Sequence, residues 1–365
     1  MNTPKIANRW KEDPDLGTER LQDLGPSGQK TSPIPMSFGL STDDDLALGK
    51  ELASVFQDKL VHPVFIFGSK GSGKTTLIAS ILKYIQDREE ASASIELAED
   101  VLPPGDQWAH RLSASRDLFY RKVFDYMENA APPSTQEEWP FFVPVRLIRA
   151  TGEEVVFAFL EGKGEWYHPD ETSEVPFQPF KGLLQGMLLN FNEPATFIYV
   201  APFATESFAE HSGSNHLAMS DKGLLGVLTW YQSLRKAHAH HDHHMLMVSK
   251  WDIFCESPVS PEFVDPTADE IQNVLRDRYP LTWNRYLKST FSAERQNRSF
   301  SAYCSGLMTG STIASVSGAA ADNVAFFPRK FWDWMYENAT GQVLYPDVRP
   351  AKPTLLDRLL NFLRG

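Results

Sequence analysis

The octapeptide at residues 68–75 limits the possible folds of this 365-residue chain more than any other feature. Its sequence, GSKGSGKT, matches the pattern G-x-x-x-x-G-K-[S/T] in full. A short apolar run, residues 62–67, comes before it, and apolar residues recur at helical spacing after it, over residues 77–85. In this order of strand, glycine-rich turn and helix, backbone N–H groups at the start of the helix face a bound anion. The octapeptide therefore predicts an α/β fold built around a phosphate-binding loop.

The residue types of this loop fit the chemistry of a nucleoside triphosphate. Glycines let the backbone curl so that successive N–H groups face the phosphates. Lys74 is expected to neutralise the β- and γ-phosphates, Thr75 to place its hydroxyl on Mg²⁺, and Thr76 to contact the α-phosphate. A glycine-rich turn with a chance lysine is the alternative, and the flanking strand and helix argue against it. The predicted nucleotide-binding residues here are Gly68, Ser69, Lys70, Gly71, Ser72, Gly73, Lys74, Thr75 and Thr76.

Alternating elements along the chain predict the fold class. A helix should begin at Thr42 and the three aspartates after it, and another at a capping box, Thr267 to Glu270, that ends before Pro280. Further strands are predicted at residues 143–148, 154–160, 195–200, 245–248 and 299–304. This alternation is typical of the three-layer α/β fold of P-loop NTPases, with a mostly parallel sheet between two helical layers.

The chain is expected to contain one large domain with two appendages. Residues 1–40 are rich in Pro, Gly and charge and are predicted to form a flexible N-terminal tail. The P-loop domain is predicted to cover residues 41–340, with an insertion at about 87–142 that carries a helical patch around residues 116–127. A C-terminal extension, residues 341–365, should contain a short amphipathic helix.

Composition excludes several classes of function. The net charge of −12 leaves no broad basic face for a nucleic-acid backbone, so no nucleic-acid partner is expected. The start of the chain, MNTPKIANRW, lacks the apolar core of a secretory signal, and no apolar run approaches the roughly 18 residues of a membrane span. Two cysteines are too few for a disulfide framework. A soluble, cytoplasmic protein is therefore expected.

A second motif follows the strand predicted at residues 245–248. It reads Ser249-Lys250-Trp251-Asp252 and resembles the Asn/Thr-Lys-x-Asp guanine motif of GTPases, with Ser249 in place of Asn or Thr. A carboxylate at Asp252 can accept hydrogen bonds from N1 and N2 of guanine, a donor pair that adenine lacks, and the stem of Lys250 can lie along the purine. A solvated strand end with an ordinary lysine and aspartate is the alternative. The motif favours GTP over ATP.

A third motif follows the strand predicted at residues 154–160. It reads Glu161-Gly162-Lys163-Gly164-Glu165 and resembles the D-x-x-G motif of GTPases, with Glu for Asp. In that alignment Glu161 would hold Mg²⁺ through a water, and the Gly164 N–H would meet the γ-phosphate. Glu165 would orient or deprotonate the attacking water, or else serve as a salt-bridge residue on a mobile loop.

Two weaker candidates complete the predicted site. Thr135, in the sequence Pro-Pro-Ser-Thr at 132–135, could close over Mg²⁺ and the γ-phosphate as a switch residue, although a plain proline-rich loop is the alternative. Ser305 follows the strand predicted at residues 299–304, where the last base-contacting loop of GTPases would come.

Taken together, residues 61–310 resemble P-loop GTPases of the translation-factor-related (TRAFAC) class. The G-x-G-E ending of the third motif and the Pro-Pro-x-Thr sequence are similar to the bacterial double-GTPase families. The resemblance implies a Mg²⁺-dependent GTP hydrolase that acts as a switch on a protein partner, including a second GTPase, in bacterial conflict or signalling systems. The changes at Glu161 and Ser249 leave slow hydrolysis and relaxed guanine choice open.

Three other interpretations remain open. An ATP-dependent motor or regulatory ATPase would use the same phosphate loop, with Lys250 and Asp252 incidental. A pseudo-enzyme scaffold would bind nucleotide only to keep its shape. The histidine-rich run at residues 238–244 could bind Zn²⁺ or Ni²⁺, or form a solvated surface loop; its candidate ligands are His238, His240, His241, Asp242, His243 and His244.

Overall fold

The computed structural model describes most of the chain from residue 43 to residue 345. The described residues are 43–87, 93–117, 119–120, 141–162, 164–167, 182–203, 213–235, 237–238, 241–255, 266–288, 298–309, 312–314 and 319–345. Contacts divide the chain after Phe38, and every described residue belongs to the unit Gly39–Gly365. The predicted tail, Thr135 and the predicted C-terminal helix lie outside the described residues.

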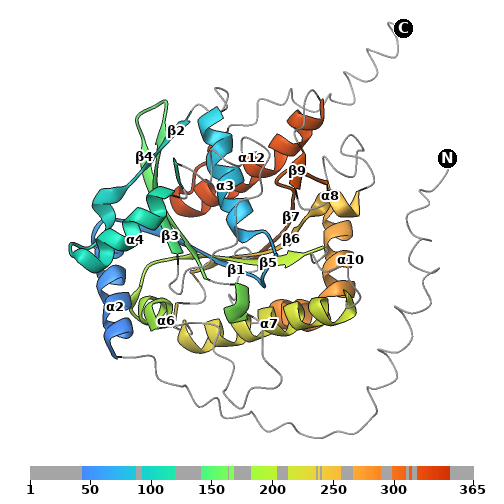
Figure 1. The fold of residues 1–365 in the computed structure, drawn as a ribbon, viewed down its shortest axis with the longest axis horizontal. Coiled ribbons are helices and arrows are strands. Elements are labelled where there is room, and N and C mark those ends of the chain that lie inside the picture. The colour runs from blue at the N-terminus through green and yellow to red at the C-terminus, as the bar shows by residue number, and fades with distance from the viewer. Residues whose placement is uncertain are drawn as a thin grey trace, which may run out of the picture. The chain divides into compact units, whose positions relative to one another are not determined.

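A seven-stranded sheet forms the centre of this unit, in the order β2-β3-β4-β1-β5-β6-β7 (Figure 1). The strands from β4 to β7 in this order run parallel to one another, while β3 is antiparallel to both β2 and β4. The mostly parallel sheet predicted from the sequence is therefore confirmed. Its strands are β1 (Val61–Phe67), β2 (Ala93–Leu97), β3 (Phe141–Arg149), β4 (Glu154–Glu161), β5 (Thr196–Pro202), β6 (His243–Ser249) and β7 (Arg298–Tyr303).

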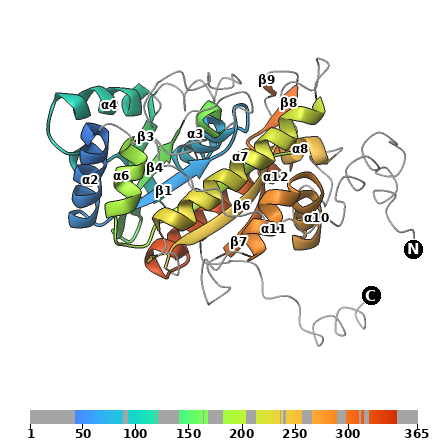
Figure 2. The ribbon, with the colours of Figure 1, turned by 90° about the horizontal axis from the view of Figure 1, so that it is seen from below.

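Helices cover both faces of the sheet, which gives the predicted three layers (Figures 1 and 2). One face carries α3 (Lys74–Asp87) and α12 (Ala319–Thr340), which pack against each other, and the Trp332 indole donates to the Ile81 carbonyl at 2.8 Å. The other face carries α2 (Asp43–Asp58), α6 (Gly182–Asn190), α7 (Gly213–Leu234), α10 (Ala268–Arg278) and α11 (Pro280–Lys288).

The remaining elements of the described part are one more helix of full length, several short turns and a pair of short strands. They are α4 (Asp106–Asp117), the four-residue helix α8 (Trp251–Phe254), the 3₁₀ turns η2 (Glu99–Val101) and η4 (Gly164–Tyr167), and a separate hairpin of β8 (Leu307–Thr309) and β9 (Thr312–Ala314). Of the helices that the structure describes, none combines the length and the apolar character needed to span a membrane.

The core lies between the two helical layers and the central strands. Strand β5 is buried along its whole length and β1 is buried at all but one position, because helices cover both faces. This burial explains why these strands are continuous apolar runs without alternation. Phe65 and Phe197 on the neighbouring strands stack with ring centroids 5.0 Å apart.

Most predicted elements are confirmed within a few residues, and the exceptions lie at the edges. The capping box is present, since the Thr267 side chain accepts from the Glu270 N–H and Glu270 accepts from the Thr267 N–H, and α11 begins at Pro280. The segment predicted as an insertion contributes β2, an edge strand that the sequence did not predict because only its last residue is buried. Its helix begins at Asp106, ten residues before the predicted patch, and residues 121–127 lie outside the described part.

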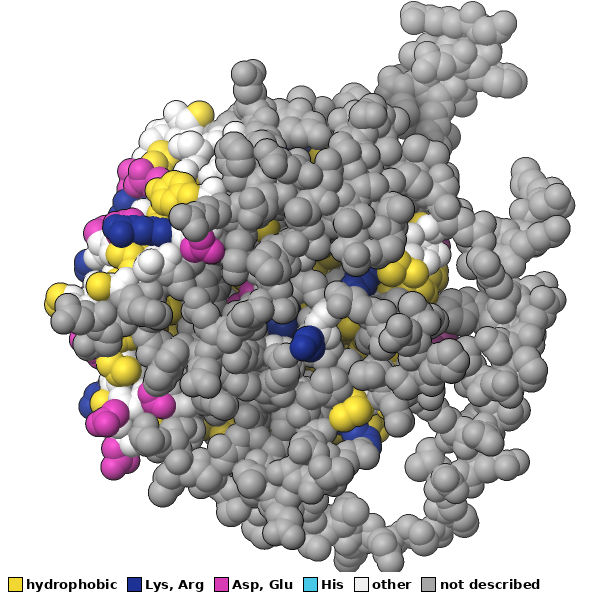
Figure 3. Space-filling view, in the orientation of Figure 1, with side chains coloured by type: hydrophobic (Ala, Val, Ile, Leu, Met, Phe, Trp, Pro, Cys, Tyr) yellow, Lys and Arg dark blue, Asp and Glu magenta, His cyan; other side chains and the backbone are white. Residues whose placement is uncertain are grey.

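Charged side chains of both signs mix on the surface near α2 and α4 (Figure 3). Two arginines of α4 and β3 form ion pairs: Arg116 Nε lies 2.6 Å from Glu99 Oε1, and Arg146 Nη1 lies 2.7 Å from Glu96 Oε1. Arg146 also contacts Asp100 at 2.9 Å. Arg116 and Arg146 are therefore both matched by carboxylates.

Candidate phosphate- and base-binding site

The three sequence motifs meet at the carboxyl edge of the parallel strands. Strand β1 lies between β4 and β5, and the helix after β1 packs on one face of the sheet while the helix after β5 packs on the other (Figure 1). In open α/β sheets, ligands bind outside the carboxyl ends of the strands where the chain changes direction in this way. The loop at 68–73 follows β1, Glu161 ends β4, and Ser249 ends β6. Segments far apart in the sequence thus come to one place.

Glycine is required at three positions of the phosphate loop, for two reasons. Gly71 has a φ of 71° and Gly73 a φ of 89°, a left-handed conformation that side chains with a Cβ adopt rarely. Gly68 is required by packing instead, because a Cβ there would lie 2.8 Å from the Val200 carbonyl oxygen and 2.5 Å from Ser72 Oγ. The loop is held in its curled shape by the neighbouring strand β5.

The ammonium group of Lys74 lies inside this curl. Lys74 is only 5% exposed, and Nζ donates to the carbonyl oxygens of Gly68 at 2.8 Å and Ser69 at 3.3 Å. It also lies 5.7 Å from the centre of the Tyr167 ring, within the range of a cation–π contact. The positive charge is thereby fixed at the start of α3, where an anion would be bound.

The hydroxyl of Thr75 meets the carboxylate of Glu161. Thr75 Oγ1 donates to Glu161 Oε1 at 2.8 Å and to Oε2 at 3.0 Å. Glu161 is buried and pairs with Ile66 in the sheet, so its side chain starts beside the phosphate loop. These two residues, predicted as metal ligands, are 86 residues apart in the sequence. The structure brings them together.

This pair fits Mg²⁺. Mg²⁺ prefers oxygen ligands and is usually held by one or two carboxylates together with substrate phosphates. Among the described residues no group of three or more His, Cys, Asp or Glu side chains could hold a metal by itself. Thr75 and Glu161 would therefore supply the protein ligands, and phosphates and water the rest.

The turn η4 lies directly on the phosphate loop. A Cβ on Gly164 would lie 2.3 Å from both N and Cα of Lys70, so only glycine allows this contact. Three residues later Tyr167 is fully buried, and its ring packs edge-on against Phe67. Burial and the nearby Glu161 carboxylate raise the pKa of Tyr167. The sequence did not single out Tyr167; the side chain of Glu165 lies outside the described residues.

The predicted guanine motif is tied to the phosphate loop through Ser249. Ser249 Oγ donates to the Ser72 carbonyl at 2.7 Å. Lys250 then takes a left-handed conformation, with a φ of 59°, and Trp251 is buried. The turn leaves Asp252 partly exposed at the start of α8. Ser249 thus contacts the loop itself, while Asp252 remains accessible to a ligand.

A thiol from the end of β7 lies beside Asp252. Cys304 Sγ is 3.7 Å from Asp252 Oδ1 and 3.1 Å from the Gly306 carbonyl oxygen. Burial and the Asp252 carboxylate raise the pKa of Cys304 well above its ordinary value, so the thiol stays protonated and can donate. The predicted contact residue Ser305 is half-buried in the same loop. Cys304 was not among the predicted site residues, because a lone cysteine has no motif around it.

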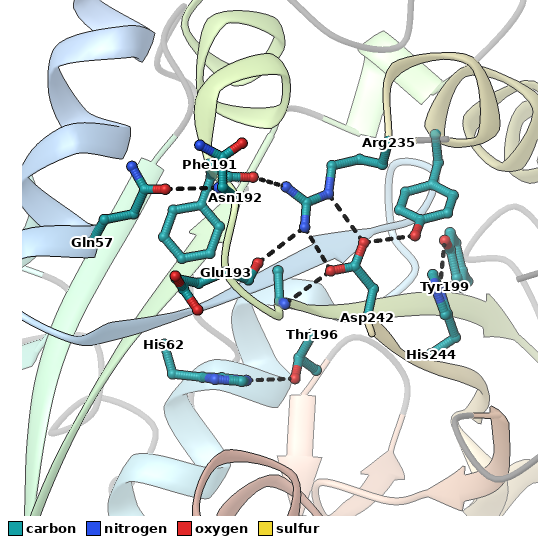
Figure 4. Close-up of polar contacts among 12 residues, drawn as sticks. Gln57, His62, Phe191, Asn192, Glu193, Thr196, Tyr199, Arg235, Asp242 and His244 are labelled. Carbon is teal, nitrogen blue, oxygen red and sulfur yellow. Dashed lines mark hydrogen bonds and ion pairs between the residues drawn. The ribbon is translucent and has the colours of Figure 1, made fainter. Parts of the chain in front are cut away.

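The interpretation of residues 238–244 as a solvated loop is wrong for Asp242. Asp242 and Arg235 are both 0% exposed, and Arg235 Nη2 lies 2.6 Å from Asp242 Oδ1 (Figure 4). Asp242 also accepts from the Tyr231 hydroxyl at 2.7 Å and from the Ala195 N–H at 3.0 Å. The carboxylate is fully used in joining α7, β5 and β6 at the amino edge of the sheet, opposite the phosphate loop.

Two histidines of this run, His243 and His244, belong to strand β6, and His241 precedes the strand. Strand β6 begins at His243, two residues earlier than predicted, and His244 is buried, with Nδ1 3.2 Å from the Tyr199 hydroxyl. His241 is exposed, and His240 lies outside the described residues. A Zn²⁺ or Ni²⁺ site is not formed by those residues of the run that the structure describes.

Comparisons with known proteins add two distant similarities of fold. No protein-family model matches the chain, and no curated relative is found by sequence. One solved structure is the signal recognition particle receptor SRb-GTP/SRX complex from Chaetomium thermophilum, with 16% identity, 76% of this chain and 97% of that chain covered, and a TM-score of 0.37. Another is Toc33 from Arabidopsis thaliana, with 10% identity, 82% and 93% covered, and a TM-score of 0.33. At these values neither similarity bears on function.

Proposed function

We propose that this protein binds GTP with Mg²⁺ and hydrolyses it, as a nucleotide-controlled switch on a protein partner. The observation that carries the proposal is the contact between Thr75 and Glu161 beside a fully formed phosphate loop. A hydroxyl and a buried carboxylate meet beside the loop where a triphosphate would lie. A bacterial conflict or signalling system, and a second GTPase as partner, are the settings that the motif resemblance suggests.

Several residues of the chain would contact the triphosphate or the attacking water, each in a different role. Lys74 would neutralise charge on the β- and γ-phosphates, and the Gly164 N–H would donate to the γ-phosphate from the turn that rests on Lys70. Thr75 and Glu161 would hold Mg²⁺, which would supply positive charge against the phosphates. Glu165 would orient the attacking water. Release of the η4 turn after phosphate departs would then be the switch event.

Guanine selection would rest on Asp252. Its side chain is partly exposed in α8, which follows β6, and accepts from the Cys304 thiol. Guanine offers N1–H and N2–H to a carboxylate, whereas adenine has no matching pair of donors. The contact from Ser249 to Ser72 supports one continuous site, because it joins the base-reading segment to the phosphate loop.

Titration of the purified protein with fluorescent GTP and ATP analogues in Mg²⁺ tests the proposal. GTP should bind at least tenfold more tightly, a difference of about 1.4 kcal/mol. Lys74→Ala should remove binding of both nucleotides. Asp252→Asn should remove the preference for GTP, and Asp277→Asn, at an exposed position of α10, is the matched control that should keep it.

Other outcomes would point to the alternatives. Equal or tighter ATP binding would overturn guanine selection by Asp252 and favour a regulatory ATPase. Tight GTP binding without phosphate release, in the presence of Mg²⁺ and of a partner, would favour a nucleotide-binding scaffold.

A further inference from the structure

We propose that Ser220 on α7 is a positioning residue that holds the phosphate loop in its binding shape; this inference rests on the proposed nucleotide site. Ser220 Oγ lies 2.7 Å from Ser69 Oγ, and both residues are only 2% exposed. A hydrogen bond between two buried hydroxyls leaves one of them without this partner if either is removed. No sequence motif includes Ser220, which lies 151 residues after Ser69.

Ser69 connects Ser220 to Lys74, because it contacts both of them. Its carbonyl oxygen accepts from Lys74 Nζ at 3.3 Å and from the Ser72 N–H at 3.2 Å. A shift of Ser69 would therefore move both the lysine and the following turn of the loop. Ser220 holds Ser69 from the α7 side, and Ser249 holds Ser72 from the β6 side. The loop is therefore held at both of these points.

Helix α7 is hydrogen-bonded to α11 next to Ser220. Asp221, the residue after Ser220, is buried and accepts from the Leu281 N–H at 3.0 Å and the Thr282 N–H at 2.8 Å, in the first turn of α11. Figure 2 shows α7 lying across the sheet beside α11. Because α7 also packs against η4, one helix supports both the phosphate loop and the turn that carries Gly164. A fixed support of this kind reduces the ordering that a ligand must impose on its site.

The test is a double-mutant cycle on the serine pair, read by affinity for a fluorescent GTP analogue with Mg²⁺. Ser220→Ala and Ser69→Ala should each weaken binding by roughly fivefold to twentyfold, the range of one buried hydrogen bond. The double variant should bind about as well as the weaker single variant, because both changes remove the same bond. Ser220→Thr, which keeps a hydroxyl, should recover most of the affinity.

A matched control separates positioning from general damage to α7. Ser233 is an exposed serine of the same helix whose Oγ donates to the Trp230 carbonyl, so Ser233→Ala should leave affinity unchanged. Thermal midpoints without nucleotide accompany each measurement, since a merely structural role would lower the midpoint and spare the affinity of the folded protein.

Three results would overturn the inference about Ser220 while leaving the proposed function intact. They are wild-type affinity in Ser220→Ala, a lowered midpoint with unchanged affinity, or single effects that add in the double variant. Ser69→Ala breaks the same bond from the loop side, so wild-type affinity in this variant would overturn the inference even if Ser220→Ala does not fold. A wild-type protein that binds no nucleotide would instead overturn the proposed function, and this inference with it.

Discussion

The carboxylate of Glu161 reaches the Thr75 hydroxyl with both of its oxygens, at 2.8 and 3.0 Å. Glutamate in place of the aspartate of the D-x-x-G motif therefore keeps contact with the phosphate loop through its longer side chain. Ser249, the other departure from the GTPase motifs, keeps a hydrogen bond to the Ser72 carbonyl. Each changed residue retains a direct link between its motif and the phosphate loop.

At Gly164 a single added carbon atom should lower both GTP hydrolysis and stability. Gly164→Ala would put a Cβ 2.3 Å from the Lys70 backbone, so η4 must move away from the loop. We expect GTP hydrolysis to fall by at least roughly tenfold and the free energy of unfolding to fall by about 1–3 kcal/mol. Single-turnover hydrolysis and urea unfolding measure the two effects.

Gly152→Ala is the control for this change. Gly152 has a φ of 87° with no atom within 4 Å of an added Cβ, in the turn between β3 and β4. It should lose about 1–2 kcal/mol of stability through backbone strain and keep wild-type hydrolysis. Unchanged hydrolysis in Gly164→Ala would contradict a role for this turn at the phosphates.

Helix α7 and strand β6 are joined at the amino edge of the sheet by a fully buried ion pair. Besides Asp242, the guanidinium of Arg235 donates to the Glu193 carbonyl at 3.1 Å and to the Phe191 carbonyl (Figure 4). The hydrogen-bonding capacity of both charged groups is thus largely used within this corner. Such a pair aligns α7, which supports the phosphate loop at its other end.

Removing one partner of this pair should be strongly destabilising. Asp242→Asn leaves the Arg235 charge buried without its counter-charge, which should lower the free energy of unfolding by about 3–5 kcal/mol. Urea unfolding at neutral pH measures this loss. The double variant Arg235→Met with Asp242→Leu should lose less than Asp242→Asn alone, because no uncompensated charge remains. A larger loss in the double variant would contradict this explanation.

The stability of the whole molecule should depend on histidines that burial keeps neutral. Burial, together with nearby His243, lowers the pKa of His62 on β1 to about 3. The pKa of His244 lies well below its ordinary value because of burial, His243, Arg298 and Arg235. Burial also lowers the pKa of His243, although Asp242 opposes the shift.

The free energy of unfolding should therefore fall as pH drops below the ordinary pKa of histidine, about 6.5. Below the unfolded-state pKa of about 6.5 the unfolded chain binds protons that the folded chain does not, so the free energy of unfolding falls as pH drops from there towards the folded-state values. Each histidine that stays neutral in the folded protein but takes up a proton in the unfolded chain should contribute up to about 1.4 kcal/mol per pH unit. Urea unfolding at about pH 7.5 and about pH 5.5 measures the slope.

His62→Gln should reduce that slope, because the variant lacks one of the groups that takes up a proton on unfolding. His241→Gln, at an exposed position, is the control and should leave the slope as in wild type. A slope that is the same in His62→Gln and wild type would show that His62 is not kept neutral in the folded protein.

Local patterns in the chain were sufficient for the fold class and for most of its elements. The phosphate loop is contiguous, and its strand and helix follow it within a few residues, so one stretch of sequence carries the whole signal. Helix α10 was predictable for the same reason, since Thr267 and Glu270 form the capping box that starts it. Periodicity and capping depend on neighbours in the chain, so they predicted a mostly parallel sheet, which is confirmed, but not the order of its strands.

The contacts that assemble the candidate site depend on packing between distant segments. Thr75 and Glu161 meet because β4 pairs with β1, and Ser69 and Ser220 meet because α7 crosses the sheet above the loop. Asp242, in a run that looked solvated, is buried because Arg235 and two strands enclose it. No local pattern encodes such partners, since a polar residue in a sequence carries no sign of the group that will satisfy its hydrogen bonds once the layers close.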